Sequence, residues 1–264
     1  MSSLALAVRD SSTMLRRTLL HPRRYPSLTL HLLLTPVLLL LLFVYVFGDV
    51  MSAGIGGGGE ADRSEYVAYL VPGILLLTIG STTIGSAVSV TMDMTAGIIA
   101  RFRTLAIHRG AVLIGHVVGS VLRCMMSVLL VGAVAVAIGF RTTDATAVEW
   151  LPAIGLLTLA SLALTWIAVG MGLSSANPEA ASNNALPLMI LPLLSSAFVP
   201  VDAMPGWFRP IAEYQPFTPA IETLGGLLLG TGIGHNGWPA VAWCLALAVL
   251  GHLWSTSLYA RDPK

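Results

Sequence analysis

The stretch LTLHLLLTPVLLLLLFVYVF, residues 28–47, contains no acidic or basic side chain apart from His31. About 20 apolar residues in a helix cross the hydrocarbon core of a bilayer, which is roughly 30 Å thick. No water satisfies backbone groups inside that core, so such a stretch is stable there only as a helix. The stretch therefore predicts a membrane-spanning helix, and it is too long for the apolar region of a signal peptide.

Five further apolar runs have comparable lengths, about 17 to 25 residues. They cover residues 67–90, 124–140, 151–173, 185–201 and 238–259. Charged residues make up only 10% of the 264-residue chain, against about 25% in soluble domains. We therefore expect an all-α polytopic membrane protein with six transmembrane helices, in which residues 1–264 form a single domain.

Charged residues are distributed unevenly between the loops. Basic residues gather before the first run, between the second and third, and after the last: Arg9, Arg16, Arg17, Arg23, Arg24; Arg101, Arg103, Arg109; Arg261 and Lys264. The opposite loops carry nine acids: Asp49, Glu60, Asp62, Glu65, Asp144, Glu149, Asp202, Glu213 and Glu222. By the positive-inside rule, both termini are expected in the cytoplasm of a multi-pass bacterial inner-membrane protein, and the asymmetry indicates orientation rather than a nucleic-acid partner.

Two segments depart from a plain six-helix pattern. Residues 1–27 are expected on the cytoplasmic side, where the apolar residues between Leu4 and Leu20 alternate with arginines and favour an interfacial helix; a frayed basic tail is the alternative. Residues 207–233 contain a short apolar stretch that four glycines interrupt. It is too short to cross, so we expect a re-entrant or surface helical hairpin on the outer side.

The sequence offers little catalytic chemistry. A P-loop needs a lysine followed by serine or threonine, and the sole lysine is Lys264. The run GIGGGG at residues 54–59 has neither the strand nor the helix that a dinucleotide site requires, which indicates a flexible loop. Cys124 and Cys244 lie within apolar runs without metal-ligand spacing. We expect no metal, no bound cofactor and no ATP hydrolysis by this chain.

A few polar or small residues inside the runs have two interpretations. Ser81, Gly85 and Ser89 recur at helical spacing, which favours close helix packing; lining a substrate path is the alternative. Arg123 precedes the third run and either snorkels to the cytoplasmic interface or faces a substrate path. Runs one, two, four and five contain no Asp, Glu, Lys or Arg, which argues against an ion-coupled carrier.

Several motifs, in this order and at these positions between the runs, resemble the daunorubicin-resistance type of ABC-2 exporter permease. They are HPRRYPSL before the first run, LLFVYVFG at residues 41–48, YLVPGIL at 69–75, GIIARFRTLAI at 97–107 and the stretch at 191–219. The family pattern has a proline where Ala106 stands here. The resemblance implies a transport subunit that pairs with itself or a related permease and docks on cytosolic ABC ATPases, which bind ATP and Mg.

The resemblance also implies roles for two segments. The expected ATPase-coupling loop comprises Gly97, Ile98, Ile99, Arg101, Phe102, Arg103, Thr104, Ile107 and Arg109, although its arginines also fit a purely positive-inside role against anionic lipid. Apolar residues beside prolines favour an outer gate at Phe198, Val199, Pro200 and Met204, with a static cap as the alternative. The expected substrate is a hydrophobic or amphipathic drug, antibiotic or lipid; a polysaccharide or lipid-linked glycan exporter and an ion-coupled carrier remain alternatives.

Overall fold

The computed structural model describes residues 26–46, 48, 63–97, 109–141 and 147–260, and in these ranges every regular element is a helix. The elements are α2 (Pro26–Tyr45), α4 (Arg63–Thr95), α6 (Arg109–Ile138), α7 (Ala147–Ser174), α8 (Pro178–Leu193), the 3-10 helix η1 (Val201–Ala203), α9 (Arg209–Tyr214), α10 (Phe217–Leu229) and α11 (Gly237–Ala260). The predicted all-α fold is confirmed for these residues. The predicted interfacial helix between Leu4 and Leu20 lies outside them. The last two residues of the predicted cytoplasmic segment 1–27 begin α2.

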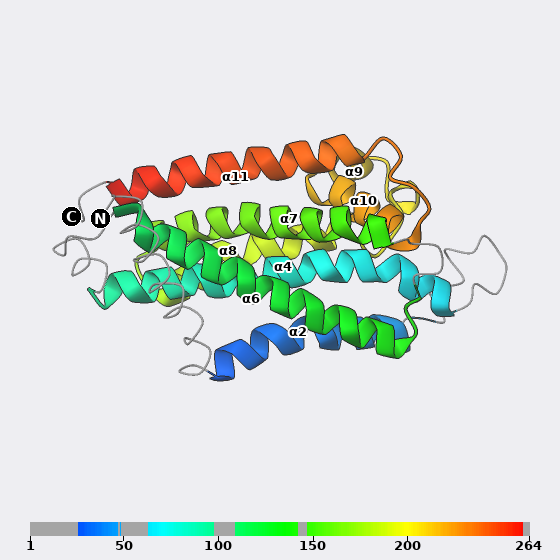
Figure 1. Cartoon of the computed structure of the whole chain (residues 1–264), viewed down its shortest axis with the longest axis horizontal. Coiled ribbons are helices and arrows are strands. Elements are labelled where there is room, and N and C mark those ends of the chain that lie inside the picture. The colour runs from blue at the N-terminus through cyan, green and yellow to red at the C-terminus, as the bar shows by residue number, and fades with distance from the viewer. Residues whose placement is uncertain (1–25, 47, 49–62, 98–108, 142–146, 261–264) are drawn as a thin grey trace.

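The long helices form one bundle whose two ends differ (Figure 1). We call the end that holds Thr95, Arg109, Ser174 and Ala260 the basal end, and the opposite end, which holds α9 and the start of α11, the distal end. Short connections between the helices make consecutive long helices antiparallel. As a result α4 runs toward the basal end and α6 runs away from it (Figure 1).

Four helices are long and apolar enough to cross a membrane: Glu65–Thr95, Leu113–Ile138, Glu149–Ser174 and Gly237–Ala260. They correspond to the predicted runs 67–90, 124–140, 151–173 and 238–259. The largest difference concerns the third run, because α6 begins at Arg109, well before residue 124. That run was predicted to begin after these polar residues, whereas in the structure His116 pairs with Asp93 of α4 and Arg123 with Ser120 of its own helix.

The first and fifth predicted runs appear as shorter apolar helices. The side chains described in α2 form an apolar segment from Leu34 to Tyr45. The fifth run was expected at 185–201, but α8 ends at Leu193, and residues 194–198 form turns. The Ser195 hydroxyl donates to the Pro192 carbonyl, a local bond that competes with continuation of the helix. At its other end α8 is capped by Asn177, whose side chain accepts from the Ala180 N–H at 2.8 Å.

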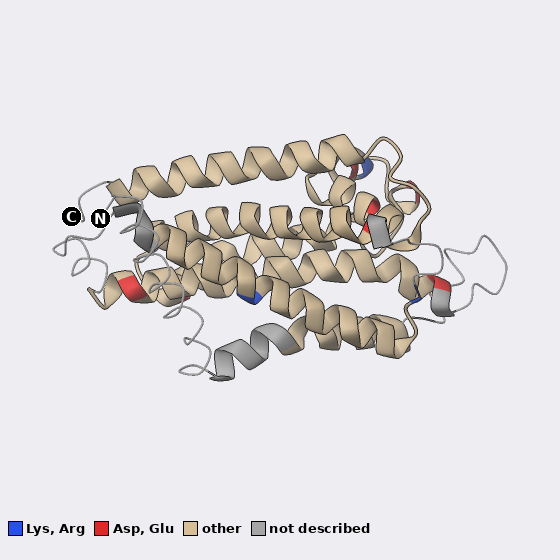
Figure 2. Ribbon diagram, in the orientation of Figure 1, with Lys and Arg blue, Asp and Glu red and all other residues tan. Residues whose placement is uncertain are grey.

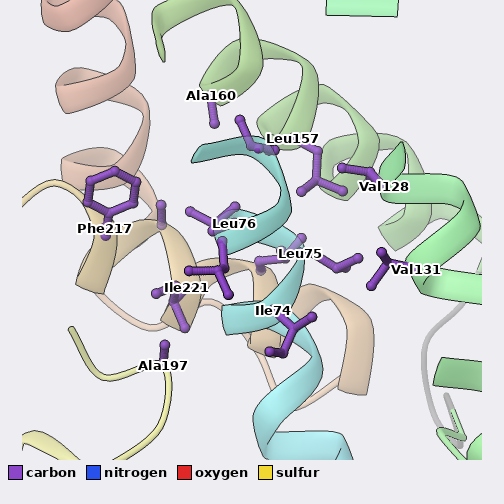
Figure 3. Packing of buried hydrophobic residues seen from close by; sticks show 14 of the residues in the cluster. Ile74, Leu75, Leu76, Val128, Val131, Leu157, Ala160, Ala197, Phe217 and Ile221 are labelled. Atoms are coloured by element: carbon purple, nitrogen blue, oxygen red, sulfur yellow. The ribbon is translucent and has the colours of Figure 1, made fainter. Parts of the chain in front are cut away.

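Helix α4 forms the centre of the bundle. Of the most apolar 18-residue segment of α4, 83% is buried inside the bundle. The corresponding shares are 28% for α6 and 17% for α11. Side chains from α4, α6, α7 and α10 meet in one apolar cluster that includes Leu75, Val128, Leu157 and Ile221 (Figure 3). Because α6 and α11 leave most of their surface uncovered, these two helices offer the apolar faces that a bilayer requires.

Two glycines allow neighbouring helices to approach α4 closely. A Cβ atom at Gly80 would lie 2.2 Å from the Leu188 carbonyl oxygen of α8, and one at Gly172 of α7 would lie 2.5 Å from the Ala87 carbonyl oxygen. The Thr91 hydroxyl donates across the second contact to the Gly172 carbonyl at 2.8 Å. Small residues and interhelical hydrogen bonds drive helix association in lipid, where apolar burial does not distinguish protein from solvent.

Candidate functional site

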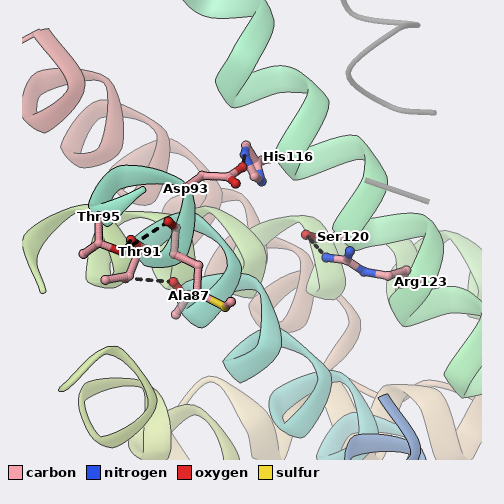
Figure 4. A network of polar contacts seen from close by, with 8 residues as sticks. Ala87, Thr91, Asp93, Thr95, His116, Ser120 and Arg123 are labelled. Atoms are coloured by element: carbon pink, nitrogen blue, oxygen red, sulfur yellow. Dashed lines mark hydrogen bonds and ion pairs between the residues drawn. The ribbon is translucent and has the colours of Figure 1, made fainter. Parts of the chain in front are cut away.

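A buried ionisable pair joins α4 to α6 near the basal end (Figure 4). Nε2 of His116 lies 3.1 Å from Oδ2 of Asp93, and the two side chains are only 8% and 10% exposed. An imidazole N–H donates to a carboxylate at this distance. Asp93 lies three residues beyond the end of the predicted second run and His116 precedes the predicted third run, so sequence reasoning missed both. Only the extension of α4 to Thr95 and of α6 back to Arg109 brings them together.

A second basic group lies farther along α6. Arg123 is partly buried, and its guanidinium donates to the Ser120 hydroxyl at 2.9 Å (Figure 4). It lies ten residues inside the candidate span that begins at Leu113, which corresponds to about 15 Å of helix. Arg123 thus lies within a candidate span and not before one. Whether it snorkels to the interface or faces a substrate path stays a prediction.

The three residues of the predicted small-residue pattern in α4 differ in their surroundings. Ser81 and Ser89 are buried and Gly85 is partly exposed. The Ser81 hydroxyl donates to the Thr78 carbonyl of its own helix at 3.0 Å. Ser89 lies one helical turn from Asp93 on the same face, so it is the member of the pattern that lies nearest the ionisable pair.

The expected coupling loop is described only at its two ends. Residues 98–108, with the candidates Ile98, Ile99, Arg101, Phe102, Arg103, Thr104 and Ile107, lie outside the described residues. Gly97 follows α4 with a φ of 67°, a left-handed conformation that favours glycine and ends a helix. Arg109 is the first residue of α6. The loop thus joins α4 and α6, the same two helices that the Asp93–His116 pair links.

The expected outer gate lies at the distal end of the bundle. Phe198 is buried, and its ring packs on that of Phe43 in α2 with centroids 4.4 Å apart. Val199 is exposed, while Pro200 and Met204 are partly buried and flank the 3-10 helix η1. Of the four candidates, Phe198 makes the contact that ties this segment to a long helix.

Polar contacts that sequence reasoning did not single out hold α10 in the distal half. The Tyr69 hydroxyl of α4 donates to the Ser196 carbonyl at 2.6 Å, and the Ser196 N–H donates to the Thr218 hydroxyl at 3.3 Å. The amide of Asn236 donates to the carboxylate of Glu222. Burial raises the pKa of the Glu222 carboxyl above its usual value. The Tyr69 bond fastens the segment between α8 and α11 to the central helix, and the other two bonds hold that segment together.

Charged groups are few in the described helices, and most of the ribbon in Figure 2 carries none. Among the described side chains, no three His, Cys, Asp or Glu residues lie close enough to hold a metal ion. Cys124 and Cys244 are buried free thiols. The described part of the chain is thus a packed helical bundle with few ionisable side chains.

Comparison with known proteins agrees with this architecture. Residues 10–229 match the sequence model of the family described as ABC-2 type transporter, so the chain belongs to that family. It is 29% identical over 230 residues to the daunorubicin resistance ABC transporter permease protein DrrB1 of Streptomyces coeruleorubidus, covering 86% of this chain and 77% of that protein.

Two further relatives are more distant. The probable doxorubicin resistance ABC transporter permease protein DrrC of Mycobacterium tuberculosis is 25% identical over 158 residues, 59% of this chain and 57% of the relative. Nodulation protein J of Rhizobium meliloti is 25% identical over 228 residues, 83% of this chain and 82% of the relative. The expected resemblance to ABC-2 permeases of the daunorubicin-resistance type is confirmed, and the chain is a multi-pass membrane protein of that family.

Proposed function

We propose that this chain is the permease subunit of an ATP-driven exporter that moves hydrophobic or amphipathic compounds, drugs among them, out of the cell. The family match over residues 10–229 carries the proposal. The names of two relatives, which concern daunorubicin and doxorubicin resistance, support a drug as cargo. The apolar bundle with its uncovered α6 and α11 supports a site of action within the bilayer.

The driving energy is proposed to come from cytosolic ABC ATPase subunits that bind ATP and Mg, with a second permease subunit completing the transporter. The family match supports this division of labour, because two drug-resistance relatives are named as permease proteins of ABC transporters. Asp93, His116 and Arg123 lie inside long helices, where an ion-coupled carrier also places ionisable groups. Family membership, and not the lack of ionisable groups, now favours the exporter.

Inside-out vesicles that contain the permease and its ATPase provide the test. We expect ATP-dependent uptake of doxorubicin by the complex, and neither uptake nor ATP hydrolysis by the purified permease alone. Uptake that follows an imposed proton gradient without ATP would instead identify an ion-coupled carrier and overturn the proposal.

The proposed topology has six crossings, with α2 and α8 added to the four long spans, and a bacterial inner-membrane location. The basal end would face the cytoplasm with both termini, and α9 and α10 would form the outer-side hairpin. Single cysteines at Ser64, Thr143 and Asn236 are expected to react with an impermeant reagent added outside, and one at Ser12 is expected to be protected. Reaction of the Asn236 cysteine only from the cytoplasmic side would contradict this topology.

The segment from Gly97 to Arg109 is the proposed contact through which the ATPases move the spans. It joins α4 to α6 in the chain, so a push on it would act on both helices. We expect Phe102→Ala to weaken association with the ATPase by about 2 kcal/mol or more, if Phe102 fills a groove on the partner. Arg101→Glu is expected to act in the same direction by reversing a charge.

Membrane insertion, co-purification of the ATPase and transport would be measured for both variants. Arg141→Glu provides the control, because Arg141 is exposed at the distal end. Normal insertion with lost association would support coupling, whereas full transport by both variants would show that the segment only anchors the helices against lipid.

The distal segment of Phe198, Val199, Pro200 and Met204 is proposed to gate substrate release. Phe198→Ser would remove the ring contact with Phe43 and place a hydroxyl in an apolar closure. We expect this variant and Met204→Ser to lower doxorubicin transport about tenfold, equivalent to about 1.4 kcal/mol. Ile211→Ser, at an exposed position of α9, is expected to transport normally. Unchanged transport by folded Phe198→Ser and Met204→Ser proteins would favour a static cap.

A further inference from the structure

Ser196, in the segment between α8 and η1, has a backbone that is held from both sides and a hydroxyl that is not bonded. The Ser196 carbonyl accepts from the Tyr69 hydroxyl of α4 at 2.6 Å, and the Ser196 N–H donates to the Thr218 hydroxyl at 3.3 Å. The residue is only 5% exposed, and among the described residues its hydroxyl has no hydrogen-bond partner. Buried hydroxyls are normally satisfied, so one that is held in place without a partner calls for a ligand or water.

A second buried hydroxyl of this kind lies beside Tyr69. Tyr66 precedes Tyr69 by three residues, so both side chains lie on the same side of α4, and the two phenols interact electrostatically. Tyr66 is 1% exposed, and its hydroxyl has no partner within the described part of the chain. The bond between Tyr69 and Ser196 is therefore accompanied by two unsatisfied hydroxyls, one from each of the segments that it joins.

An acidic side chain from α10 completes the group. The Glu222 carboxyl acts electrostatically on the Tyr69 phenol, and the Ser196 side chain lies beside that carboxyl without forming a hydrogen bond to it. The Asn236 amide donates to the Glu222 carboxylate. Glu222 is exposed, so a compound can reach its carboxylate from the surface of the bundle. We call Tyr66, Tyr69, Ser196 and Glu222 the distal polar cluster.

The distal polar cluster has a negative charge that no described basic side chain balances. Arg209 pairs with Asp202, while Glu222 and Glu213 have no basic partner among the described side chains. Acidic residues lie near one another at this end of the bundle, beside α9 and α10 (Figure 2). Burial raises the pKa of the Glu222 carboxyl, and the charges of Glu213 and Asp202 raise it further. Surroundings that favour a proton on a carboxylate also favour a bound cation.

We propose that the distal polar cluster binds the protonated amino group of an exported amphipathic compound before its release. An alkylammonium has one positive charge and several N–H donors, which match the Glu222 carboxylate and the hydroxyl oxygens of the cluster. Ser196 lies two residues before Phe198, so the compound's apolar part would meet the ring of the proposed gate. The inference rests on the proposed function for its cargo and for the outer position of the distal end.

The ligand atoms favour an organic ammonium over a metal ion. Calcium takes roughly six to eight oxygen ligands, several of them carboxylates. The distal polar cluster has one carboxylate, and no three His, Cys, Asp or Glu residues among the described side chains could share a metal ion. Ala197 and Ile221, the chain neighbours of Ser196 and Glu222, are buried apolar residues. A charged group attached to a hydrocarbon body suits this combination better than a bare ion does.

Equilibrium binding tests the site without requiring transport. The full-length permease is placed in nanodiscs of phosphatidylcholine, whose headgroup has no N–H donor, and empty nanodiscs give the background. The probes are doxorubicin, which has a protonated amine, and its N-acetyl derivative, which keeps the apolar rings and loses the charge. Their fluorescence is titrated with wild type, Glu222→Gln and Ser196→Ala.

Two further variants serve as controls. Glu213→Gln makes the same change of charge at an exposed position of α9, at the same end of the bundle. Thr165→Val removes another buried hydroxyl that has no partner among the described residues, nine residues from the basal end of α7. Both controls are expected to bind each probe within threefold of wild type.

We expect Glu222→Gln to weaken doxorubicin binding at least tenfold and to leave binding of the N-acetyl derivative within threefold. Ser196→Ala is expected to weaken doxorubicin binding at least threefold without lowering the unfolding midpoint, because the Ser196 hydroxyl makes no hydrogen bond that the fold would lose. A purely structural role for this hydroxyl would not separate binding from stability in this way.

Three results would overturn the proposal: equal binding of the two probes by wild type, equal loss of both probes in Glu222→Gln, or unchanged doxorubicin binding in both Glu222→Gln and Ser196→Ala. The expected differences in binding, found together with a complex that does not transport doxorubicin with ATP, would contradict the proposed function and still support the ammonium site.

Discussion

Replacing Gly80 by valine is expected to abolish accumulation of folded protein. The Cβ atom would lie 2.2 Å from the Leu188 carbonyl oxygen and 3.0 Å from the Leu188 carbonyl carbon, and both belong to the backbone of α8. Backbone atoms do not yield as a flexible side chain does, so α4 and α8 would have to separate. Overpacking of a buried contact costs about 1–3 kcal/mol or more, and α4 is the helix on which α7, α8 and α10 all pack.

A matched control is available in α7. A Cβ atom at Gly155 would meet nothing within 4 Å, so Gly155→Val is expected to leave the amount and melting temperature of the protein nearly unchanged. The measurement is the yield of monodisperse protein in detergent together with its thermal unfolding midpoint. Gly80→Ala is expected to fall between wild type and Gly80→Val. Equal midpoints for Gly80→Val and wild type would show that the α4–α8 contact is looser than described.

Breaking the Asp93–His116 pair is expected to be the most damaging change among the described ion pairs. Removing either partner takes a charge-assisted contact away from a buried side chain, and breaking a buried pair costs about 3–5 kcal/mol. We therefore expect His116→Ala and Asp93→Ala each to lower the unfolding midpoint and to impair transport. The double variant should be less harmful than the sum of the two, because it removes both buried groups.

The exposed pair between Arg209 and Asp202 provides the comparison. Their side chains are 49% and 82% exposed, and surface ion pairs contribute about 0–1 kcal/mol. Asp202→Ala is accordingly expected to change the unfolding midpoint little. If the two alanine substitutions at Asp93 and His116 prove strictly additive, the residues do not interact, and the pair does not link α4 to α6.

Much of the fold could be predicted from run length and composition. Four of the six apolar runs coincide with helices that are long enough to cross a membrane, and the all-helical class follows from the need to satisfy backbone groups in lipid. The boundaries were less predictable. The second run was ended before Asp93 and the third was begun after Arg123, which truncated α4 at residue 90 and started α6 at residue 124. Hydropathy does not show which ionisable side chains have partners inside the bundle.

The candidate site shows the same division. Sequence patterns indicated the coupling loop and the outer gate, and the roles of both stay predictions. Most of the loop lies outside the described residues. Among the predicted gate residues, Phe198 makes a ring contact with Phe43 of α2. The Asp93–His116 pair gave no sequence signal, since an acid and a histidine separated by 23 positions match no motif. A helical wheel shows the face on which each of these two residues lies, but not that the two residues meet.

The sequence by itself determined that this chain is a helical membrane protein that resembles the ABC-2 permeases. These properties depend on composition, on the length of apolar runs and on local motifs. Only the tertiary structure decided that α4 is the central helix, that Gly80 must remain small, and that Asp93 meets His116. Those properties depend on which helix faces which, and contacts between residues distant in the chain are set by the packing of the whole bundle.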